Sequence, residues 1–256
     1  MQAGVVAAPR AAALERLNAV LRRFRGRGWA IIPVGSIVGV IFLIRYTPNS
    51  ANWLTWLALI AVPLLAAVAL GWAARGSAPW LAALAAGLFV LVWRAPHSLV
   101  GEAAGSLLCG LSCVTLGVLL AAVTPSAWLK AGIVAMSAAD VWLVATDLLQ
   151  HPNATLVAAA PGVAGLPQLQ SESFGTVSMG YGDLFVAALL GAIYAHDRRL
   201  QWSAAAITLV LAAVFDLLFF VVDELPATVP VAVAMCLIQV GLTSGRIGPA
   251  RARRLG

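Results

Sequence analysis

Charged residues are scarce in this chain of 256 residues. Only 10% of the residues are Asp, Glu, Lys or Arg, whereas soluble domains hold about 25%. The hydrophobic share is 62% and the mean hydropathy is +0.95, so the sequence predicts an all-α polytopic membrane protein and excludes an ordinary soluble domain. The net charge of +6 does not indicate nucleic-acid binding, because nearly all basic residues stand in the termini and in short connections between apolar runs.

Cysteine is also rare, with three residues in the whole chain. Cys109 and Cys113 lie one helical turn apart in a single apolar run, and Cys236 is alone in another. This spacing excludes a disulfide framework and provides no metal-binding pattern, so we expect small packing residues. A cleaved signal peptide is not expected either, because no small-residue cleavage site follows the first apolar run, 29–44.

Long apolar runs are abundant instead, and they predict about eight transmembrane helices. The shortest runs, of 15 or 16 residues, fall below the roughly 17–25 residues that a span normally needs. Residues 1–28 are rich in arginine and carry apolar side chains at helical spacing, which indicates a basic helix on the cytoplasmic membrane surface. The apolar runs are 29–44, 53–74, 79–93, 99–123, 126–149, 174–195, 201–222 and 226–243.

The basic residues indicate how these helices cross the membrane. If the N-terminus is inside, the cytoplasmic segments hold 14 Lys and Arg residues, and the outer side holds only Arg45 and Arg94. Positive charge concentrates on the cytoplasmic side of membrane proteins, and both termini inside requires an even number of spans. We therefore expect an integral multi-pass protein of a prokaryotic plasma membrane, with N- and C-termini in the cytoplasm.

Two aspartates interrupt the apolar runs at matching positions. Asp140 lies nine residues before Leu149, the expected outer end of one helix, and Asp183 lies nine residues after Phe174, the expected outer end of the next. At about 1.5 Å per residue, both carboxyl groups would lie roughly 13 Å below the outer end. A carboxylate in hydrocarbon is costly unless it is paired, protonated or hydrated, so such residues indicate a functional site. Two acids at one depth on consecutive antiparallel helices can meet.

A pair of close carboxyl groups suits peptide-bond hydrolysis. The two groups do not both ionise comfortably, so one holds a proton while the other is charged. One acid can then activate water while the other protonates the scissile carbonyl or the leaving nitrogen, as in aspartic proteases. Gly180 and Gly182 beside Asp183 would let the backbone loosen and a substrate approach closely.

A helical substrate must unwind before it is cut, and its freed backbone groups then need new partners inside the membrane. Addition of the unwound segment to an exposed strand would provide them. The connection 150–173 contains NATLVAAAP, a short extended-looking run that offers such a strand. The alternative is that this connection is a plain outer loop.

Three pieces of this region resemble one known family. AADVWLVATD (138–147) and MGYGDLFVAALLGAIYAHD (179–197) resemble the two catalytic segments of the GxGD intramembrane aspartyl proteases, the signal peptide peptidase and presenilin group. LPATVPVAVA (225–234) resembles the Pro-Ala-Leu segment of their last helix. The similarity covers roughly residues 126–243, and the order of the three pieces is more specific than any one of them.

The resemblance implies a presenilin- or signal peptide peptidase-like bundle with Asp140 and Asp183 as the catalytic pair. Its substrates would be single transmembrane helices, such as remnant signal peptides or type II anchors, cut in the lipid bilayer without a metal or an organic cofactor. The orientation expected above is that of signal peptide peptidases and opposite to presenilins. The residues that would shape the site are Gly180, Tyr181, Gly182, Pro226, Ala227 and Thr228.

The expected organisation follows from these assignments. A basic cytoplasmic segment (1–28) precedes a four-helix scaffold (29–123), and the catalytic helices (126–243), with an outer loop at 150–173, precede a basic cytoplasmic tail (244–256). The chain departs from the family at Ala139, where tyrosine is usual, and at Thr228, which replaces leucine. It also has eight predicted helices where the family has nine. A catalytically inactive relative is therefore an alternative.

Other function classes remain open. TVSMGYGDL also resembles the TVGYGD filter of potassium channels, although two prolines interrupt the stretch where a pore helix would stand. A proton-coupled transporter would use Asp140, Asp183 and Asp216 as relay carboxylates. Prepilin peptidases carry a GxGD that is usually followed by lysine, whereas Leu184 follows here. Asp147 and Lys130 lie near expected helix ends, where we expect interfacial roles.

Overall fold

The fold is taken from a computed structural model. It describes residues 20–21, 23–47, 49–96, 98–148, 150–159, 166–174, 177–220, 222 and 225–244. Most of the predicted basic segment 1–28 and almost all of the predicted tail 244–256 lie outside the described residues.

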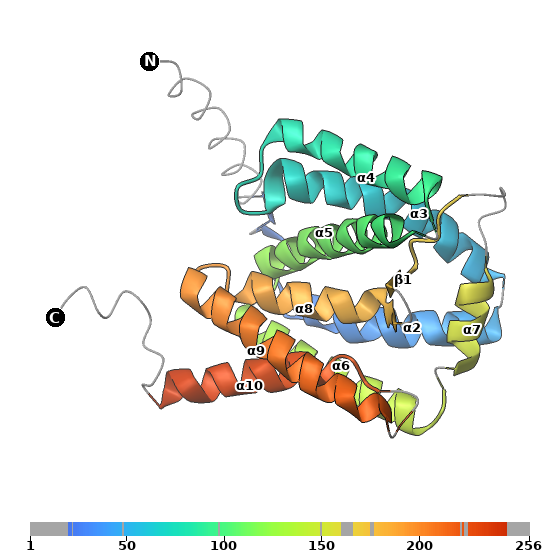
Figure 1. Cartoon of the computed structure of the whole chain (residues 1–256). Coiled ribbons are helices and arrows are strands. Elements are labelled where there is room, and N and C mark those ends of the chain that lie inside the picture. Colours follow the sequence, from blue (N-terminus) through green and yellow to red (C-terminus); the bar gives the residue numbers. More distant parts are fainter. Residues whose placement is uncertain are drawn as a thin grey trace, which may run out of the picture.

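Helices dominate the described chain, and most of them lie side by side along one direction, with successive helices running in opposite directions (Figure 1). Short 3₁₀ or π segments are marked η. The elements in chain order are η1 (Gly28–Ile31), α2 (Ile32–Tyr46), α3 (Ser50–Val68), η2 (Ala69–Ala73), η3 (Pro79–Leu81), α4 (Ala82–Arg94), α5 (Leu99–Val123), α6 (Ser126–Ala145), α7 (Gln150–Ala158), β1 (Ser171–Phe174), β2 (Val177–Gly180), α8 (Tyr181–Ile193), α9 (Arg198–Asp216), η4 (Leu217–Phe220) and α10 (Val229–Thr243).

Five helices within the described residues are long and apolar enough to cross a membrane. They are Gly28–Tyr46, Ser50–Ala73, Leu99–Val123, Ser126–Ala145 and Arg198–Asp216. Three further apolar helices, Pro79–Arg94, Tyr181–Ile193 and Val229–Thr243, are shorter. Helices therefore occupy all eight predicted apolar runs and make a membrane-embedded helical protein, while the count of eight spans stays a prediction.

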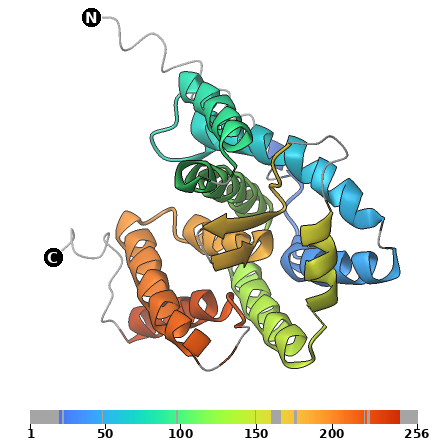
Figure 2. The ribbon, with the colours of Figure 1, turned by 45° about the vertical axis from the view of Figure 1, so that its right-hand side comes forward.

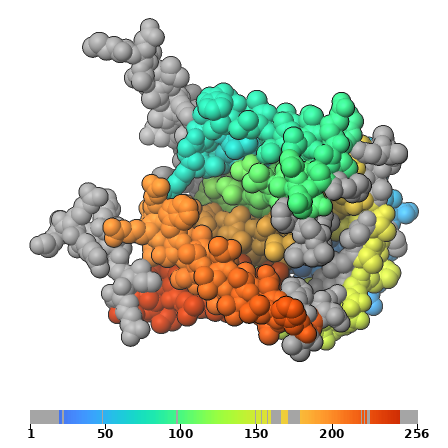
Figure 3. Space-filling view, in the orientation of Figure 1, coloured from blue at the N-terminus to red at the C-terminus, as the bar shows by residue number. Residues whose placement is uncertain are grey.

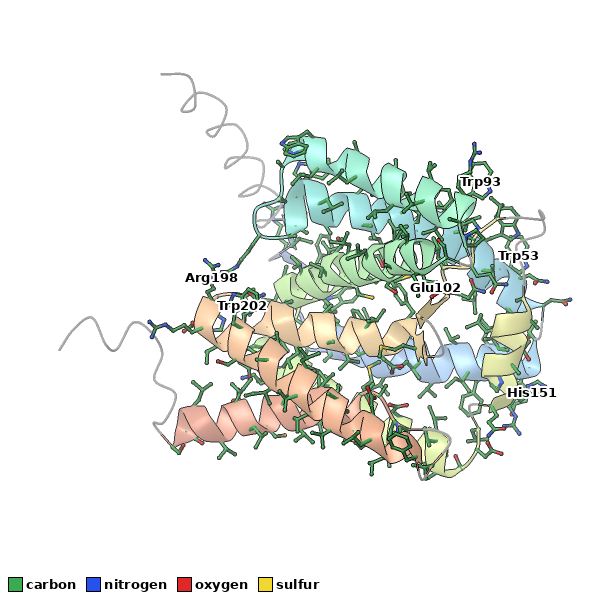
Figure 4. The ribbon with its side chains drawn as sticks, in the orientation of Figure 1. Trp53, Trp93, Glu102, His151, Arg198 and Trp202 are labelled. Atoms are coloured by element: carbon green, nitrogen blue, oxygen red, sulfur yellow. The ribbon has the colours of Figure 1, made fainter. Side chains whose placement is uncertain are left out.

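The outer surface of the bundle suits a lipid environment. Large apolar side chains of α9, including Trp202, Leu209 and Val214, are exposed, and this helix lies at the surface in Figure 3. Trp53 and Trp93 lie at one end of the bundle and Trp202 lies at the other (Figure 4). Tryptophans at both ends of an apolar bundle are typical of the two membrane–water interfaces.

Local sequence explains where several helices begin. The side chain of Ser98 accepts a bond from Gly101 N at the start of α5, and Asp197 accepts bonds from Arg199 N and Leu200 N at the start of α9. Such caps satisfy backbone N–H groups that lack a partner within the helix. Proline stands in the first turn of both α2 and α10, where its missing N–H costs nothing.

The all-α prediction holds for most of the described chain, with an exception in the stretch that holds residues 171–174 and 177–180. This stretch forms an antiparallel hairpin in which Ser171 pairs with Gly180 and Phe174 pairs with Val177. The expected helix 174–195 therefore begins only at Tyr181. Serine, valine and glycine are weak helix formers and make up most of the two strands, so the apolar run did not continue as a helix.

The end of one helix and the connection after it also differ from the expectation. The helix expected at 126–149 ends at Ala145, because Asp147 has the positive φ of 56° that ends a helix in the left-handed conformation. The connection 150–173 is not a plain outer loop, since it contains α7 and the first strand. The extended run expected at NATLVAAAP is also wrong, because Gln150–Ala158 is helical.

Helix α5 occupies the middle of the bundle. Its most extensive contact is with α8, and it also packs against α3, α4 and β1 (Figure 2). At Gly117, a Cβ atom would lie 3.1 Å from the backbone of Ala188, so α5 and α8 approach each other closely. The helix that carries Asp183 is thus supported from the N-terminal part of the chain.

Candidate active site

Asp140 lies on α6, five residues before its end, and only 8% of its surface is exposed. Its Oδ2 accepts two hydrogen bonds from Thr228, one from the backbone N at 3.2 Å and one from Oγ1 at 2.7 Å. One helical turn earlier, Ser137 Oγ donates to the carbonyl oxygen of Thr228 at 3.0 Å. Two polar side chains of α6 therefore bind one residue at the start of α10.

Asp183 lies in a different local setting. It is the third residue of α8, directly after the hairpin, and its Oδ2 accepts a hydrogen bond of 3.2 Å from Gly180 N. The expected depth of nine residues inside a helix is wrong, because the preceding residues are strand. The carboxyl group instead caps the helix start, where the aligned peptide dipoles favour negative charge.

Helices α6 and α8, which carry these two carboxyl groups, pack against each other. A Cβ at Gly182, next to Asp183, would lie 3.7 Å from Met136 Cε, one helical turn before Asp140 on α6. Asp140 is buried and Asp183 is half-buried. Two acids that the sequence separates by 43 positions therefore lie on helices that pack against each other, and we call them the acidic pair.

The predicted residues around Asp183 have separate structural tasks. A Cβ at Gly182 would lie 2.9 Å from Ile37 Cδ1, so α2 passes closely over this backbone. A Cβ at Gly180 would lie 3.2 Å from Asp183 Oδ2, and any larger residue would crowd the carboxyl group. Tyr181 turns away toward α5, where its hydroxyl lies 2.7 Å from Ser112 Oγ.

The predicted residues Pro226, Ala227 and Thr228 come before α10 and are not helical. Pro226 and Ala227 are half-buried, whereas Thr228 is buried and contacts Asp140 directly. The helix expected from residue 226 therefore begins three residues later, at Val229. This unwound stretch brings backbone and side-chain donors to the acidic pair.

Sequence reasoning missed Ser112 and Ser137 as residues that support the site. Each is a buried serine on a helix that faces another polar group, Tyr181 in one case and Thr228 in the other. A serine within an apolar helix is a weak signal by itself, because it can bond to its own helix backbone. Ser112 does so as well, donating to Cys109 O.

Other ionisable residues are not part of the acidic pair. Asp216 is the last residue of α9 and is exposed, and Asp147 is exposed just after α6. Lys130 lies near the start of α6 with its Nζ 5.6 Å from the centre of the Tyr194 ring. Within the part of the chain that the structure describes, no three His, Cys, Asp or Glu side chains cluster as metal ligands, and a metal-free reaction stays a prediction.

Comparisons with protein-family models, with curated proteins and with solved structures find no match for this chain. A functional interpretation therefore depends on the residues of the site and their geometry.

Proposed function

We propose that this protein is an intramembrane aspartyl endopeptidase that hydrolyses peptide bonds within transmembrane helices. The observation that supports the proposal is the packing of α6 against α8, two apolar helices that carry Asp140 and Asp183. Acidic side chains inside a membrane bundle are costly, and repulsion between two nearby acids adds to that cost, so such a pair indicates a functional site. Signal-peptide remnants and type II anchors are the proposed substrate class.

In the proposed reaction, the two acids share one proton. The ionised member removes a proton from water, and the resulting hydroxide adds to the scissile carbonyl carbon. The protonated member donates its proton to the carbonyl oxygen and later, as the C–N bond breaks, a proton passes to the leaving nitrogen. Water is consumed, and the products are a new carboxyl group and a new amine.

The hairpin offers a place for the unwound substrate. Strand β2 ends at Gly180 and leads within three residues to Asp183. A substrate segment paired with this hairpin as a further strand would satisfy its backbone groups beside the acidic pair. This hairpin replaces the NATLVAAAP run as the proposed strand partner.

The proposed orientation places both termini in the cytoplasm of a prokaryotic plasma membrane. The turns that would face the cytoplasm hold Arg75, Arg198 and Arg199, whereas Arg45 and Arg94 stand at the opposite ends of their helices. Arg75 also donates a hydrogen bond to the Ala195 carbonyl oxygen, which joins two of these turns. The acidic pair would then be nearer the outer surface.

The helical conformation of Tyr181, Gly182 and Asp183 favours the peptidase over a potassium filter. A filter presents extended backbone carbonyl groups to the ion, whereas Tyr181, Gly182 and Asp183 form the first turn of α8. A proton relay through Asp216 also has less support, since that residue is exposed at the end of α9. Loss of proton-coupled uptake in Asp216→Asn would favour transport instead.

Cleavage of a synthetic signal-peptide helix by the purified full-length protein in lipid nanodiscs tests the proposal. We expect Asp140→Asn and Asp183→Asn each to lower the cleavage rate by about 100- to 10,000-fold, the size of an acid–base contribution. Asp216→Asn is the matched control and is expected to keep the wild-type rate. Full cleavage by either pair variant would overturn the mechanism, and potassium flux into liposomes that persists in Asp140→Asn would support a channel.

A further inference from the structure

Each polar group of Thr228 makes a hydrogen bond to a side chain of α6 at the acidic pair. Its N–H and its hydroxyl both donate to Asp140 Oδ2, and its carbonyl oxygen accepts from Ser137 Oγ. Thr228 is fully buried and lies 88 positions from Asp140 in the sequence. Three hydrogen bonds therefore join one residue to one face of α6.

The hydrogen bonds of Thr228 are unusual for its position at the start of α10. Thr228 is the N-cap residue of α10, a position where a threonine hydroxyl usually accepts a bond from its own helix. No such side-chain bond forms at Thr228. The hydroxyl instead donates to Asp140 at 2.7 Å, and the N-cap N–H, which a helix does not use internally, donates to the same oxygen.

We propose that Thr228 is a positioning residue for the Asp140 carboxyl group in the hydrolytic reaction. Both donors bind Oδ2, so they fix the plane of the carboxyl group and leave Oδ1 for water and for Asp183. The leucine of the resembling family has no hydroxyl, and threonine at this position adds a donor rather than removing a function. This inference rests on the proposed peptidase activity.

A purely structural role for Thr228 makes a different prediction. If the residue only attaches α10 to α6, then any loss of polar contact between these segments should have the same effect. Ser137 provides the comparison, because Ser137→Ala removes one of the three bonds and leaves both donors to Asp140 in place. Thr228→Val has nearly the same volume as threonine and removes only the hydroxyl donor.

The kinetic test uses the full-length protein, the synthetic signal-peptide helix and four variants. We expect Thr228→Val and Thr228→Leu to lower kcat by about 10- to 100-fold with little change in KM, the effect of losing one bond to a charged group. Thr228→Ser keeps the hydroxyl and should retain kcat within about threefold of the wild type. Ser137→Ala should lower the melting temperature about as much as Thr228→Val while kcat falls by less than about threefold.

Three outcomes of this comparison overturn the inference. The first is a wild-type kcat in Thr228→Val, and the second is a loss in Ser137→Ala as large as the loss in Thr228→Val. A loss in Thr228→Ser equal to that in Thr228→Val also contradicts a role for the hydroxyl.

Infrared spectroscopy tests the Asp140 contact without any cleavage. Protein labelled with ¹³C-aspartate gives a carboxyl band for Asp140 that disappears in Asp140→Asn. We expect this band to shift in Thr228→Val and to stay in place in Thr228→Ser, because the band frequency depends on hydrogen bonding to the oxygen. An unshifted band in Thr228→Val overturns the inference even if the peptide is cut. No cleavage by the wild type, with a shifted band, overturns the proposed peptidase but not the contact.

Discussion

The two halves of the acidic pair are held in different ways. Asp140 lies within a continuous helix, and its partner comes from the far end of the chain, 88 positions away. Asp183 stands at a junction between strand and helix, and its recorded bond comes from Gly180, three positions away. Tertiary packing therefore fixes one carboxyl group, whereas local chain geometry fixes the other.

The supports behind the two sides also differ. Thr228, at the start of α10, contacts α6. Both hydrogen-bond donors to Asp140, the N–H and the hydroxyl of Thr228, therefore belong to the C-terminal part of the chain. Helix α8 packs most extensively on α5, which belongs to the segment predicted as a scaffold. The site thus depends on both predicted segments, 29–123 and 126–243, and changes on α5 should affect the Asp183 side alone.

Of the substitutions that test how Asp140 and Asp183 are held, Gly117→Ala should have the largest effect on stability and activity. A Cβ there would lie 3.1 Å from backbone atoms of Ala188, which cannot rotate away as a side chain can. We expect the free energy of unfolding to fall by about 1–3 kcal/mol, together with cleavage activity, because α8 carries Asp183. Thermal unfolding in nanodiscs and peptide cleavage measure the two effects.

Gly110→Ala on the same helix is the control for Gly117→Ala. No atom lies within 4 Å of a Cβ at Gly110, so alanine should instead raise the free energy of unfolding by about 0.5–1 kcal/mol. If both variants behave alike, the close approach of α5 and α8 does not support Asp183.

Tyr181→Phe should have a smaller effect on the same side. It removes the bond between the Tyr181 hydroxyl and Ser112 Oγ, worth about 0.6–1.5 kcal/mol of unfolding free energy. We expect kcat to fall severalfold, because Tyr181 is two residues from Asp183. A double-mutant cycle with Ser112→Ala measures the coupling between the two residues.

Tyr194→Phe is a matched control at the other end of α8. Its hydroxyl accepts a bond of 2.7 Å from Gln239 Nε2, the same length as the bond at Tyr181. The loss of stability should be similar, and cleavage should be unchanged. An equal loss of kcat in both variants would mean that general destabilisation, rather than the position of Asp183, lowers activity.

The sequence was sufficient to predict the places of the helices and that two acids fall on helices that pack against each other. Apolar length and the depth of each acid along its run carry this information, and both depend on local composition. Asp183 lies in the first turn of α8 rather than inside a longer helix, and Asp140 lies five residues before the end of α6, so each acid is near the end of its helix that is expected to face outward. Both expected helix ends were displaced toward the outer side, so the errors partly cancelled.

The hairpin and the polar contacts could not be predicted in the same way. A hydropathy window does not separate a short hairpin from the end of a membrane helix, because the window averages the hairpin with the apolar residues of α8 that follow it. The role of Thr228 depends on how the start of α10 packs against α6. Residue spacing in the sequence does not reveal this tertiary contact. From the sequence, Thr228 was therefore only a departure from the family motif, whereas in the structure its hydroxyl donates a hydrogen bond to Asp140.

Asp147→Gly should have the smallest effect, and it concerns the Asp140 side. Asp147 ends α6 with a φ of 56°, and Leu148 N closes the turn on Leu143 O at 3.1 Å. Glycine adopts this conformation without steric cost, so we expect the free energy of unfolding to rise by up to about 1 kcal/mol. Because Thr228 already holds Asp140, cleavage should stay at the wild-type rate.

Gly76→Ala is the reverse test: it adds a side chain at a residue with positive φ, whereas Asp147→Gly removes one. Gly76 has a φ of 75° in the turn before η3, and no atom lies within 4 Å of its Cβ position, so alanine changes only the backbone cost. We expect a loss of about 1 kcal/mol, measured by the same thermal unfolding. A lower melting temperature in Asp147→Gly would show that its carboxylate stabilises the helix end by more than the strain costs. A lower cleavage rate would show that the end of α6 helps to hold Asp140, in which case local geometry supports both sides of the pair.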